Sequence, residues 1–263
     1  MNSAHWHLLK QLTLRSIQTR IRGSILGWGW IVGQPLLMMT VYTVVFGLIF
    51  GGSYEGQPDD SRMMYALGIF LSLGLYNFFS EVLNCAPQII LGNTVYVKKV
   101  AFPLELLPLS GVGAPIVTML VQMVLVIVVA LVAGVFQPLG LLYLLPSGVI
   151  LATLGLGVAF WFSALGVFIR DLQQIAGVMG LVLLYASGIF YSPESVQLQE
   201  PAIWTILQFN PIVYLVSVPR ATLLFGTEAQ LLGLCYAAVF AGIVLWSGYA
   251  FFRWIKTSFA DVL

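Results

Sequence analysis

Only one acidic residue, Glu81, lies within the long apolar stretches of this sequence that are candidates to cross a membrane. A carboxylate is costly to bury at membrane depth, so such a residue is a candidate for function. Glu81 also lies near one end of its predicted helix, where it can instead reach the lipid headgroups or a neighbouring subunit. Both interpretations stay open from the sequence alone.

The usual catalytic and nucleotide-binding patterns are incomplete. His5 and His7 form an H-x-H pair with no third ligand, which favours surface histidines over a metal site. Both histidines lie on the N-terminal tail, so no Ser/His/Asp arrangement can form within the spans. No GxxxxGK[ST] loop occurs, and no lysine follows a glycine. We therefore expect no catalytic residues, and a transporter built from this chain would take its energy from another polypeptide.

The composition points to a bilayer as the solvent. The chain of 263 residues is 60% hydrophobic and 8% charged, with a mean hydropathy of +0.97. A soluble domain carries about 25% charged residues, so most of this surface is unsuited to water. Cys85 and Cys235 both lie in apolar segments and give no disulfide framework. We predict a single transmembrane domain over 1–263.

The spacing of charges sets the number of crossings, because a helix needs about 20 apolar residues to cross the hydrocarbon core. The charge-free stretch 106–169 must hold two crossings, with a turn at 136–140 between them. We predict six spanning helices, at about 31–50, 63–85, 107–134, 141–169, 172–192 and 231–252.

The apolar stretch 201–219 is broken in its middle by Asn210-Pro211, which leaves halves too short to span. With six spans, nine cations lie on the cytoplasmic side, and only Arg62 and Arg220 lie outside, which fits the positive-inside rule. Both termini are then cytoplasmic. Residues 193–230 form an external region with short re-entrant or interfacial helices between spans five and six.

The N-terminal segment has the pattern of an interfacial helix. Leu14, Ile17 and Ile21 share one helical face, and the polar and basic residues among them lie off it. We predict that residues 1–26 form an amphipathic helix in the inner headgroup layer, followed by a bend into the first span. The alternative is one long helix with a basic end.

The loop after the second span, "GNTVYVKKVAFPLELLPLS" (92–110), has the features of a contact surface. Lys98-Lys99 and Glu105 bracket an apolar stretch that ends at Pro103. This pattern predicts a short helix on the membrane face that is presented to a partner.

The loop "GVFIRDLQQI" (166–175) holds the only charged pair, Arg170-Asp171, between two long spans. It is a second candidate contact. The alternative is a tight turn with an exposed ion pair worth at most ~1 kcal/mol.

Small and aromatic residues are plentiful in the spans. Gly155, Ala159 and Ser163 recur every four positions, which suits a bundle core and a dimer seam equally well. Aromatic rings can stack on sugars, but packing is their commoner role in membranes.

Taken together, these segments resemble the membrane subunit of polysaccharide ABC exporters. This family comprises the Wzm-like O-antigen permeases of the type-two ABC permeases, which are related to teichoic-acid and capsule exporters. The resemblance covers nearly the whole chain and is carried by 20–46, 97–110, 166–175, 209–225 and 251–263.

The resemblance implies an all-α integral membrane permease of the bacterial cytoplasmic (inner) membrane, with both termini cytoplasmic. It implies a homodimer that binds two copies of a separate cytoplasmic ATPase, which brings ATP and Mg. The implied substrate is a lipid-linked polysaccharide, and no nucleic-acid partner is expected. A drug or small-lipid exporter of the same architecture is the nearest alternative, and an intramembrane enzyme or assembly scaffold is a more distant one.

The resemblance also assigns roles to residues. The coupling loop 88–105 and its neighbours would contact the ATPase through Asn93, Tyr96, Lys98, Lys99, Phe102, Glu105, Arg15, Arg20, Arg170 and Asp171. Candidates for the substrate channel are Tyr76, Phe79, Glu81, Trp161, Tyr185 and Tyr191. The external gate, within 193–230, would include Asn210, Pro211 and Arg220.

Overall fold

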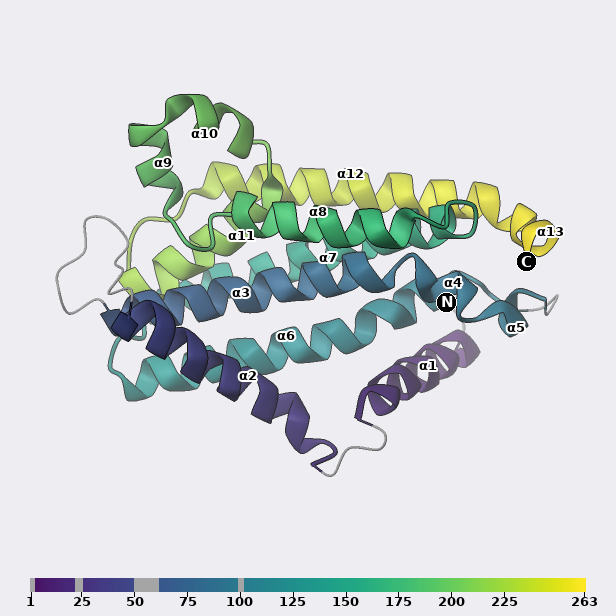
Figure 1. Cartoon of the computed structure of the whole chain (residues 1–263), viewed down its shortest axis with the longest axis horizontal. Coiled ribbons are helices and arrows are strands. Elements are labelled where there is room, and N and C mark those ends of the chain that lie inside the picture. The colour runs from purple at the N-terminus through teal and green to yellow at the C-terminus, as the bar shows by residue number, and fades with distance from the viewer. Residues whose placement is uncertain (1–2, 22–25, 50–61, 99–101) are drawn as a thin grey trace.

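The structure is a computed structural model that describes residues 3–21, 26–49, 62–98 and 102–263 (Figure 1). All regular secondary structure in this part of the chain is helical. Five helices are long and apolar enough to cross a membrane, and one bent helix pair is a sixth candidate. The predicted all-α membrane fold is confirmed.

The long helices form one bundle whose centre is α3. In α3, 83% of the apolar span is buried, compared with 28% in α12. The outer helices expose many large apolar side chains, as lipid-facing helices do. Figure 1 shows the members of the bundle lying along the long axis of the molecule: α3 (Arg62–Cys85), α6 (Leu106–Val132), α7 (Leu141–Gly166), α8 (Leu172–Ala186) and α12 (Leu231–Ile255).

Glycines bring α7 and α12 into close contact. A Cβ on Gly157 would lie 2.6 Å from the backbone N of Leu245. A Cβ on Gly248 would lie 2.5 Å from the carbonyl O of Gly157. The two backbones therefore approach as closely as small residues allow in membrane helices.

The row of small residues on α7 belongs to the bundle core. Gly155, Ala159 and Ser163 are all buried, and a Cβ on Gly155 would lie 2.9 Å from Cε1 of Phe78 on α3. Of the two roles that the sequence left open for this row, the structure favours packing within one protomer.

The first apolar helix stands apart from the bundle. α2 (Gly29–Tyr42) continues as a π-helix, η1 (Thr43–Ile49), and Pro35 is its only buried residue in the described part. Figure 1 shows η1 close to α3, while the N-terminal end of α2 diverges from α3 and α6. The predicted span 31–50 therefore forms a loosely attached wall of the protein.

The N-terminal helix α1 (Ser3–Ile21) packs along α6. A Cβ on Gly113 of α6 would lie 2.4 Å from Cγ2 of Thr13, and Ile17 is buried. Leu14 of the predicted apolar face is 41% exposed, while Thr13 and Ile17, four positions apart, lie on the side that packs on α6. The side chain of Ile21 lies outside the described residues.

α1 and α2 are separate helices, so the alternative of one long helix is wrong. α1 ends at Ile21 and α2 begins at Gly29, after a turn in which Gly27 has a φ of +49°. That φ favours glycine over residues with a Cβ. Trp28 and Trp30, beside the turn, are 56% and 40% exposed.

The fifth predicted span is shorter than expected. Its helix, α8, ends at Ala186 rather than 192, and Gly188 turns the chain with a φ of +68°. A helix of 15 residues is about 22 Å long, less than the ~30 Å of the hydrocarbon core.

The two ends of the bundle differ. Figure 1 shows the C-terminus at the same end as α4, α5 and the start of α1, which is here termed the termini end. The opposite end, termed the far end, holds α9 and α10, and the turn between α6 and α7 at 133–137. The short elements are α4 (Gln88–Leu91), α5 (Thr94–Val97), η3 (Pro138–Gly140), α9 (Pro193–Gln199), α10 (Pro201–Leu207), η5 (Lys256–Ser258) and α13 (Phe259–Val262).

The break predicted at Asn210-Pro211 is present. α10 and the following helix, α11 (Pro211–Arg220) with its π-helical continuation η4 (Ala221–Phe225), meet at 103°. α11 is buried along most of its length, whereas α10 has no buried residue. This is the geometry of a short re-entrant helix that other protein encloses, as the membrane interior requires.

Replacing Gly248 with Leu should destabilise the protein by about 2 kcal/mol, because the new side chain meets the backbone of α7 at Gly157. The matched control is Gly242→Leu on the same helix, where a Cβ would have no neighbour within 4 Å. Thermal unfolding of the purified protein in detergent measures both. Equal melting temperatures for the two variants would contradict the packing described here.

Candidate functional site

The predicted coupling loop is tied to the N-terminal helix at the termini end. Nη1 of Arg15 donates a hydrogen bond to the hydroxyl of Tyr96 at 3.2 Å. The ring of Tyr96 also lies 4.6 Å from that of Phe102, between centroids. Asn93 steadies the turn between α4 and α5 by donating to the carbonyl of Ile89 at 2.8 Å. The structure therefore brings together four residues that the sequence assigned to one surface.

The outward side of this loop offers both apolar and cationic contacts. Val95 is 67% exposed, and Lys98 beyond it is exposed as well. Lys99 and the side chain of Arg20 lie outside the described residues, so their predicted roles stay predictions.

An ion pair joins the loop to the C-terminal segment. Nζ of Lys256 lies 2.5 Å from Oε1 of Glu105, and both side chains are mostly shielded from solvent. Burial alone would raise the pKa of Glu105, but the hydrogen bonds from Lys256 and the backbone, with the charges of Lys256 and Arg253, hold the pKa below its usual value. Glu105 is therefore charged at neutral pH and fixes the start of α6.

The C-terminal segment also packs on the second predicted contact. Phe259 of α13 is fully buried, with ring centroids 5.5 Å from Phe252 and 6.1 Å from Phe168. Phe168 precedes Arg170 and Asp171, whose side chains are both exposed at the turn between α7 and α8. The two loops that the sequence predicts to be cytoplasmic thus both contact the C-terminal segment, which lies within the range 251–263 that carries part of the resemblance.

Arg220 is the main polar contact of the far end. The side chain is 3% exposed and donates hydrogen bonds to the carbonyls of Gly188 at 2.7 Å, Ile189 at 3.1 Å and Tyr191 at 3.1 Å. It also donates to Oγ of Ser72 on α3 at 3.2 Å. The guanidinium therefore links α11, the irregular segment after α8, and the central helix.

Asn210 caps α11 and joins it to the end of α8. Its side-chain oxygen accepts from the backbone N of Ile212 at 3.0 Å, an N-cap contact, and Pro211 takes the first helical position. Its amide donates to the carbonyl of Ala186 at 3.0 Å and to Ser187 at 3.2 Å. The three predicted gate residues therefore hold the re-entrant helix in place.

The predicted channel aromatics fall into two groups. Tyr76 and Phe79 lie in the packed core, where the Tyr76 hydroxyl donates to the carbonyl of Gly180. Trp161 is partly buried and stacks on Phe251 at 4.4 Å. These contacts are those of packing residues.

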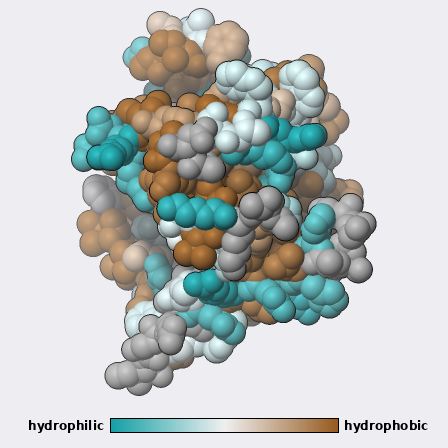
Figure 2. Space-filling model, turned by 90° about the vertical axis from the view of Figure 1, so that its right-hand side faces the viewer, coloured by the Kyte–Doolittle hydropathy of each residue, from teal (hydrophilic) through white to brown (hydrophobic). Residues whose placement is uncertain are grey.

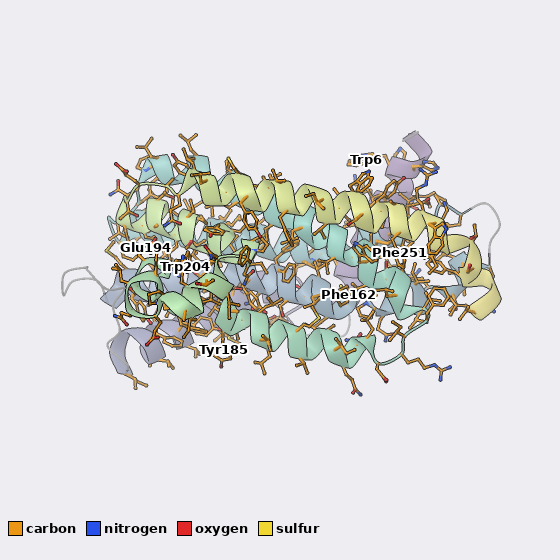
Figure 3. The ribbon with its side chains drawn as sticks, turned by 90° about the horizontal axis from the view of Figure 1, so that it is seen from above. Trp6, Phe162, Tyr185, Glu194, Trp204 and Phe251 are labelled. Carbon is orange, nitrogen blue, oxygen red and sulfur yellow. The ribbon has the colours of Figure 1, made fainter. Side chains whose placement is uncertain are left out.

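Tyr185 and Tyr191 lie nearer the surface. Tyr185 is 63% exposed on the outer side of α8, as Figure 3 shows, and its carbonyl accepts a hydrogen bond from the Tyr191 hydroxyl at 3.0 Å. Both border a 600 Å³ pocket beneath α9 and α10. Their roles in a channel stay predictions.

Glu81 lines a polar cleft that the sequence did not reveal. The cleft has a volume of 490 Å³, lies between α2, α3 and α6, and is termed the α2 cleft. Its described lining consists of Trp30, Ile31, Gln34, Pro35, Met38, Tyr42, Asn77, Ser80, Glu81, Thr118 and Gln122. Asn77, Ser80 and Glu81 share one face of α3, and this i, i+3, i+4 spacing was the signal available in the sequence.

Sequence comparison decides the family. Residues 7–224 match the family model described as "ABC-2 type transporter". The chain belongs to this family. The resemblance drawn from the sequence segments is therefore confirmed.

Individual relatives match this ABC-2 chain over nearly its whole length. The O-antigen export system permease protein RfbA of Klebsiella pneumoniae is 26% identical, over 97% of this chain and 95% of that protein. The protein of the same name from Myxococcus xanthus is 26% identical, over 97% and 94%. The polysialic acid transport protein KpsM of Escherichia coli is 24% identical, over 93% and 92%.

This ABC-2 chain is a multi-pass membrane permease. Membrane subunits of the family do not hydrolyse ATP themselves, in agreement with the sequence, which has no phosphate-binding loop. In the described part of the chain, no group of three or more His, Cys, Asp or Glu residues could hold a metal ion.

Glu105→Gln should lower the free energy of unfolding of this permease by about 1 kcal/mol at pH 7, because it removes the ion pair with Lys256. Folding lowers the pKa of this carboxyl, so its stabilising effect is complete above the unfolded pKa of about 4.3 and is lost as pH falls through the folded pKa. Melting curves of wild type and variant should therefore differ at pH 7, and the difference should shrink as pH falls through the lowered folded pKa of Glu105. Glu200→Gln, exposed at the far end, is the control. A constant difference down to about pH 3 would count against the ion pair.

Arg220→Met should destabilise the permease by about 3 kcal/mol, because three backbone carbonyls lose a buried donor. Arg220→Lys should recover only part of this loss, since an ammonium group lacks the planar fork that reaches several acceptors. Thermal unfolding compares both with Arg170→Met, an exposed control expected to be neutral. An Arg220→Lys variant as stable as wild type would show that charge alone suffices.

Proposed function

We propose that this permease is the transmembrane subunit of an ATP-driven exporter that moves a lipid-linked polysaccharide across the bacterial cytoplasmic membrane. The observation that carries the proposal is its near-full-length similarity to proteins named for O-antigen export and for polysialic acid transport. Those two glycans differ, so what the relatives share is the export of a polysaccharide rather than of one sugar.

The termini end is the cytoplasmic end in this proposal. Figure 2 views that end and shows hydrophilic side chains gathered on it, between apolar ones. Lys98, Arg170 and Arg253 are exposed there, whereas Glu194 and Glu228 are exposed on the segments of the far end. This distribution supports the orientation, because cytoplasmic loops carry the excess of Lys and Arg.

The exporter acts as a homodimer in this proposal. The centre of the described bundle is filled by the buried side chains of α3, so a long polymer has no room to pass through one protomer. A path between two copies of the chain meets the requirement. The exposed apolar faces of α2 and α10 are available for contact with lipid or with the second copy.

The motor is a separate cytoplasmic ATPase, present in two copies and supplying ATP and Mg. Its contact surface on this chain is α5 with Lys98, helix α1 with Arg15, and the turn at Arg170. The contacts of Tyr96 with Arg15 and of Glu105 with Lys256 make this surface one connected body. Nucleotide binding to the ATPase can move this surface only if the ATPase binds two conformations of the permease with different affinity.

Replacing Lys98 and Lys99 together with Glu should lower binding of the partner ATPase at least tenfold, because two cations of the contact surface become anions. Co-purification of the ATPase with the permease, glycan-stimulated ATP hydrolysis and surface glycan are the measurements. The control is Glu228→Lys, a charge reversal on an exposed residue of the far end, which should leave assembly unchanged. Normal assembly and turnover of the double variant would remove the coupling assignment.

A further inference from the structure

We propose that the 600 Å³ pocket beneath α9 and α10, here termed the α8 pocket, binds a phospholipid whose headgroup carries a protonated primary amine. Such a lipid belongs to the surrounding membrane and is not the transported substrate, so this site goes beyond the proposed function. Three features support it: the short length of α8, the opening of the pocket onto the apolar outer surface, and the charges at its polar end.

α8 ends before a full crossing and leaves space beside its last turn. Its 15 residues span about 22 Å, whereas the 24 residues of the neighbouring α3 span about 36 Å. The chain turns at Gly188, and Figure 1 shows α9 and α10 projecting from the bundle at this end. Since the hydrocarbon core is about 30 Å thick, the α8 pocket lies where acyl chains meet headgroups.

The α8 pocket opens onto the outer apolar surface of the bundle. Val182 of α8 and Ile203 of α10 line it, and they are 61% and 50% exposed. Val178, one turn before Val182 on the same face of α8, is 64% exposed. A lipid can therefore enter sideways from the bilayer, with its acyl chains against Val182, Ile203 and Leu207.

The polar end of the pocket has groups for a phosphate. The hydroxyls of Ser192 and Ser195 lie 2.6 Å apart, so one donates to the other and one O–H remains for a phosphate oxygen. The buried guanidinium of Arg220 lies behind them, because it donates to the carbonyl of Tyr191 at 3.1 Å. Its positive charge favours a phosphate at this position.

The same end has a group for an ammonium ion. Glu200, between α9 and α10, is exposed and is the one charged residue of the described lining, which includes no Lys, Arg or His. A lipid with both a phosphate and an ammonium group places an opposite charge near Arg220 and near Glu200. A lipid with a net negative charge leaves Glu200 without a partner and is repelled by it. The charges therefore select a zwitterionic headgroup.

Charge also opposes a second copy of the chain as the occupant. A twofold axis through this pocket would bring the two Glu200 side chains together. Two copies in one bilayer share one orientation, so the exposed cations of the termini end, Lys98, Arg170 and Arg253, cannot reach the far end of the second copy. A membrane lipid meets neither difficulty.

Competition between two lipids tests the headgroup. The purified permease, depleted of lipid in detergent, is given equal amounts of phosphatidylethanolamine and phosphatidylglycerol with the same acyl chains. Native mass spectrometry counts the first lipid that binds. Wild type is compared with Glu200→Lys, and the matched control is Glu228→Lys, a charge reversal on an exposed residue of the far end outside the pocket.

We expect wild type to prefer phosphatidylethanolamine about fivefold, as one partly exposed ion pair allows. Glu200→Lys should reverse the preference, because the pocket then holds two cations, and Glu228→Lys should behave as wild type. Equal binding of the two lipids by wild type would overturn the proposal. An unchanged preference in Glu200→Lys, or the same reversal in Glu228→Lys, would overturn it as well.

A second pair of variants tests where the acyl chains lie. Val182→Trp obstructs the mouth of the pocket, whereas Val178→Trp adds the same side chain one turn away, outside the lining. Bound phosphatidylethanolamine should fall about fivefold in the first variant and stay unchanged in the second. Equal retention by both would contradict the site. A disulfide between two copies carrying Val182→Cys, in membranes and in a Cys85→Ala, Cys235→Ser background, would show that a second copy covers the pocket and would also overturn the proposal.

Discussion

The hydrogen bonds of one buried guanidinium decide how the far end of this bundle is closed. α8 stops at Ala186, and the chain then runs without regular structure through Tyr191, leaving backbone carbonyls that an apolar surrounding would not satisfy. Arg220 reaches three of them and Ser72 on the central helix. Because Arg220 is the last residue of α11, the same contacts fix the depth at which the re-entrant helix sits. The contacts of Arg220 therefore tie the irregular segment after α8 to the buried α11 and to the central helix.

Charge spacing predicted an all-helical membrane fold with about six spans but placed the helix ends poorly, above all in 172–192. A charge marks where a crossing cannot continue, whereas the break at Asn210-Pro211 and the turn at 136–140 were visible from their proline, glycine and asparagine residues. The stretch 172–193 contains no charge, so charge spacing predicted a full span there. In the structure, Gly188 turns the chain before that span is complete. The count of six spans placed Arg220 in the external region between spans five and six. Its burial depends on carbonyls that only the tertiary fold assembles, so counting charges along the chain could not reveal it.

Residue type alone did not separate packing from lining. Tyr76 and Phe79 have the aromatic character of a sugar platform, yet both lie inside the core, because helix α3 is surrounded on nearly every side. Asn77, between them in the chain, opens into the α2 cleft together with Ser80 and Glu81. Whether a side chain packs in the core or lines the cleft depends on which side of α3 it occupies relative to the neighbouring helices. Gln122 and Gly74, on two different helices, become partners only through that packing.

The termini end and the α2 cleft are connected through α6, which begins at the termini end, and through α1, which packs on it. Glu105 fixes the start of α6 to Lys256, and α6 carries Gln122 into the cleft. α1, which is bonded to the coupling loop through Arg15, packs on α6 at Gly113, between these two points. The loop and the cleft are therefore linked through α6, whereas α2 buries only Pro35 and is held by few contacts. In this arrangement, a displacement at the termini end would change the width of the cleft before it disturbs the core around α3, because α3 is far more buried than α2.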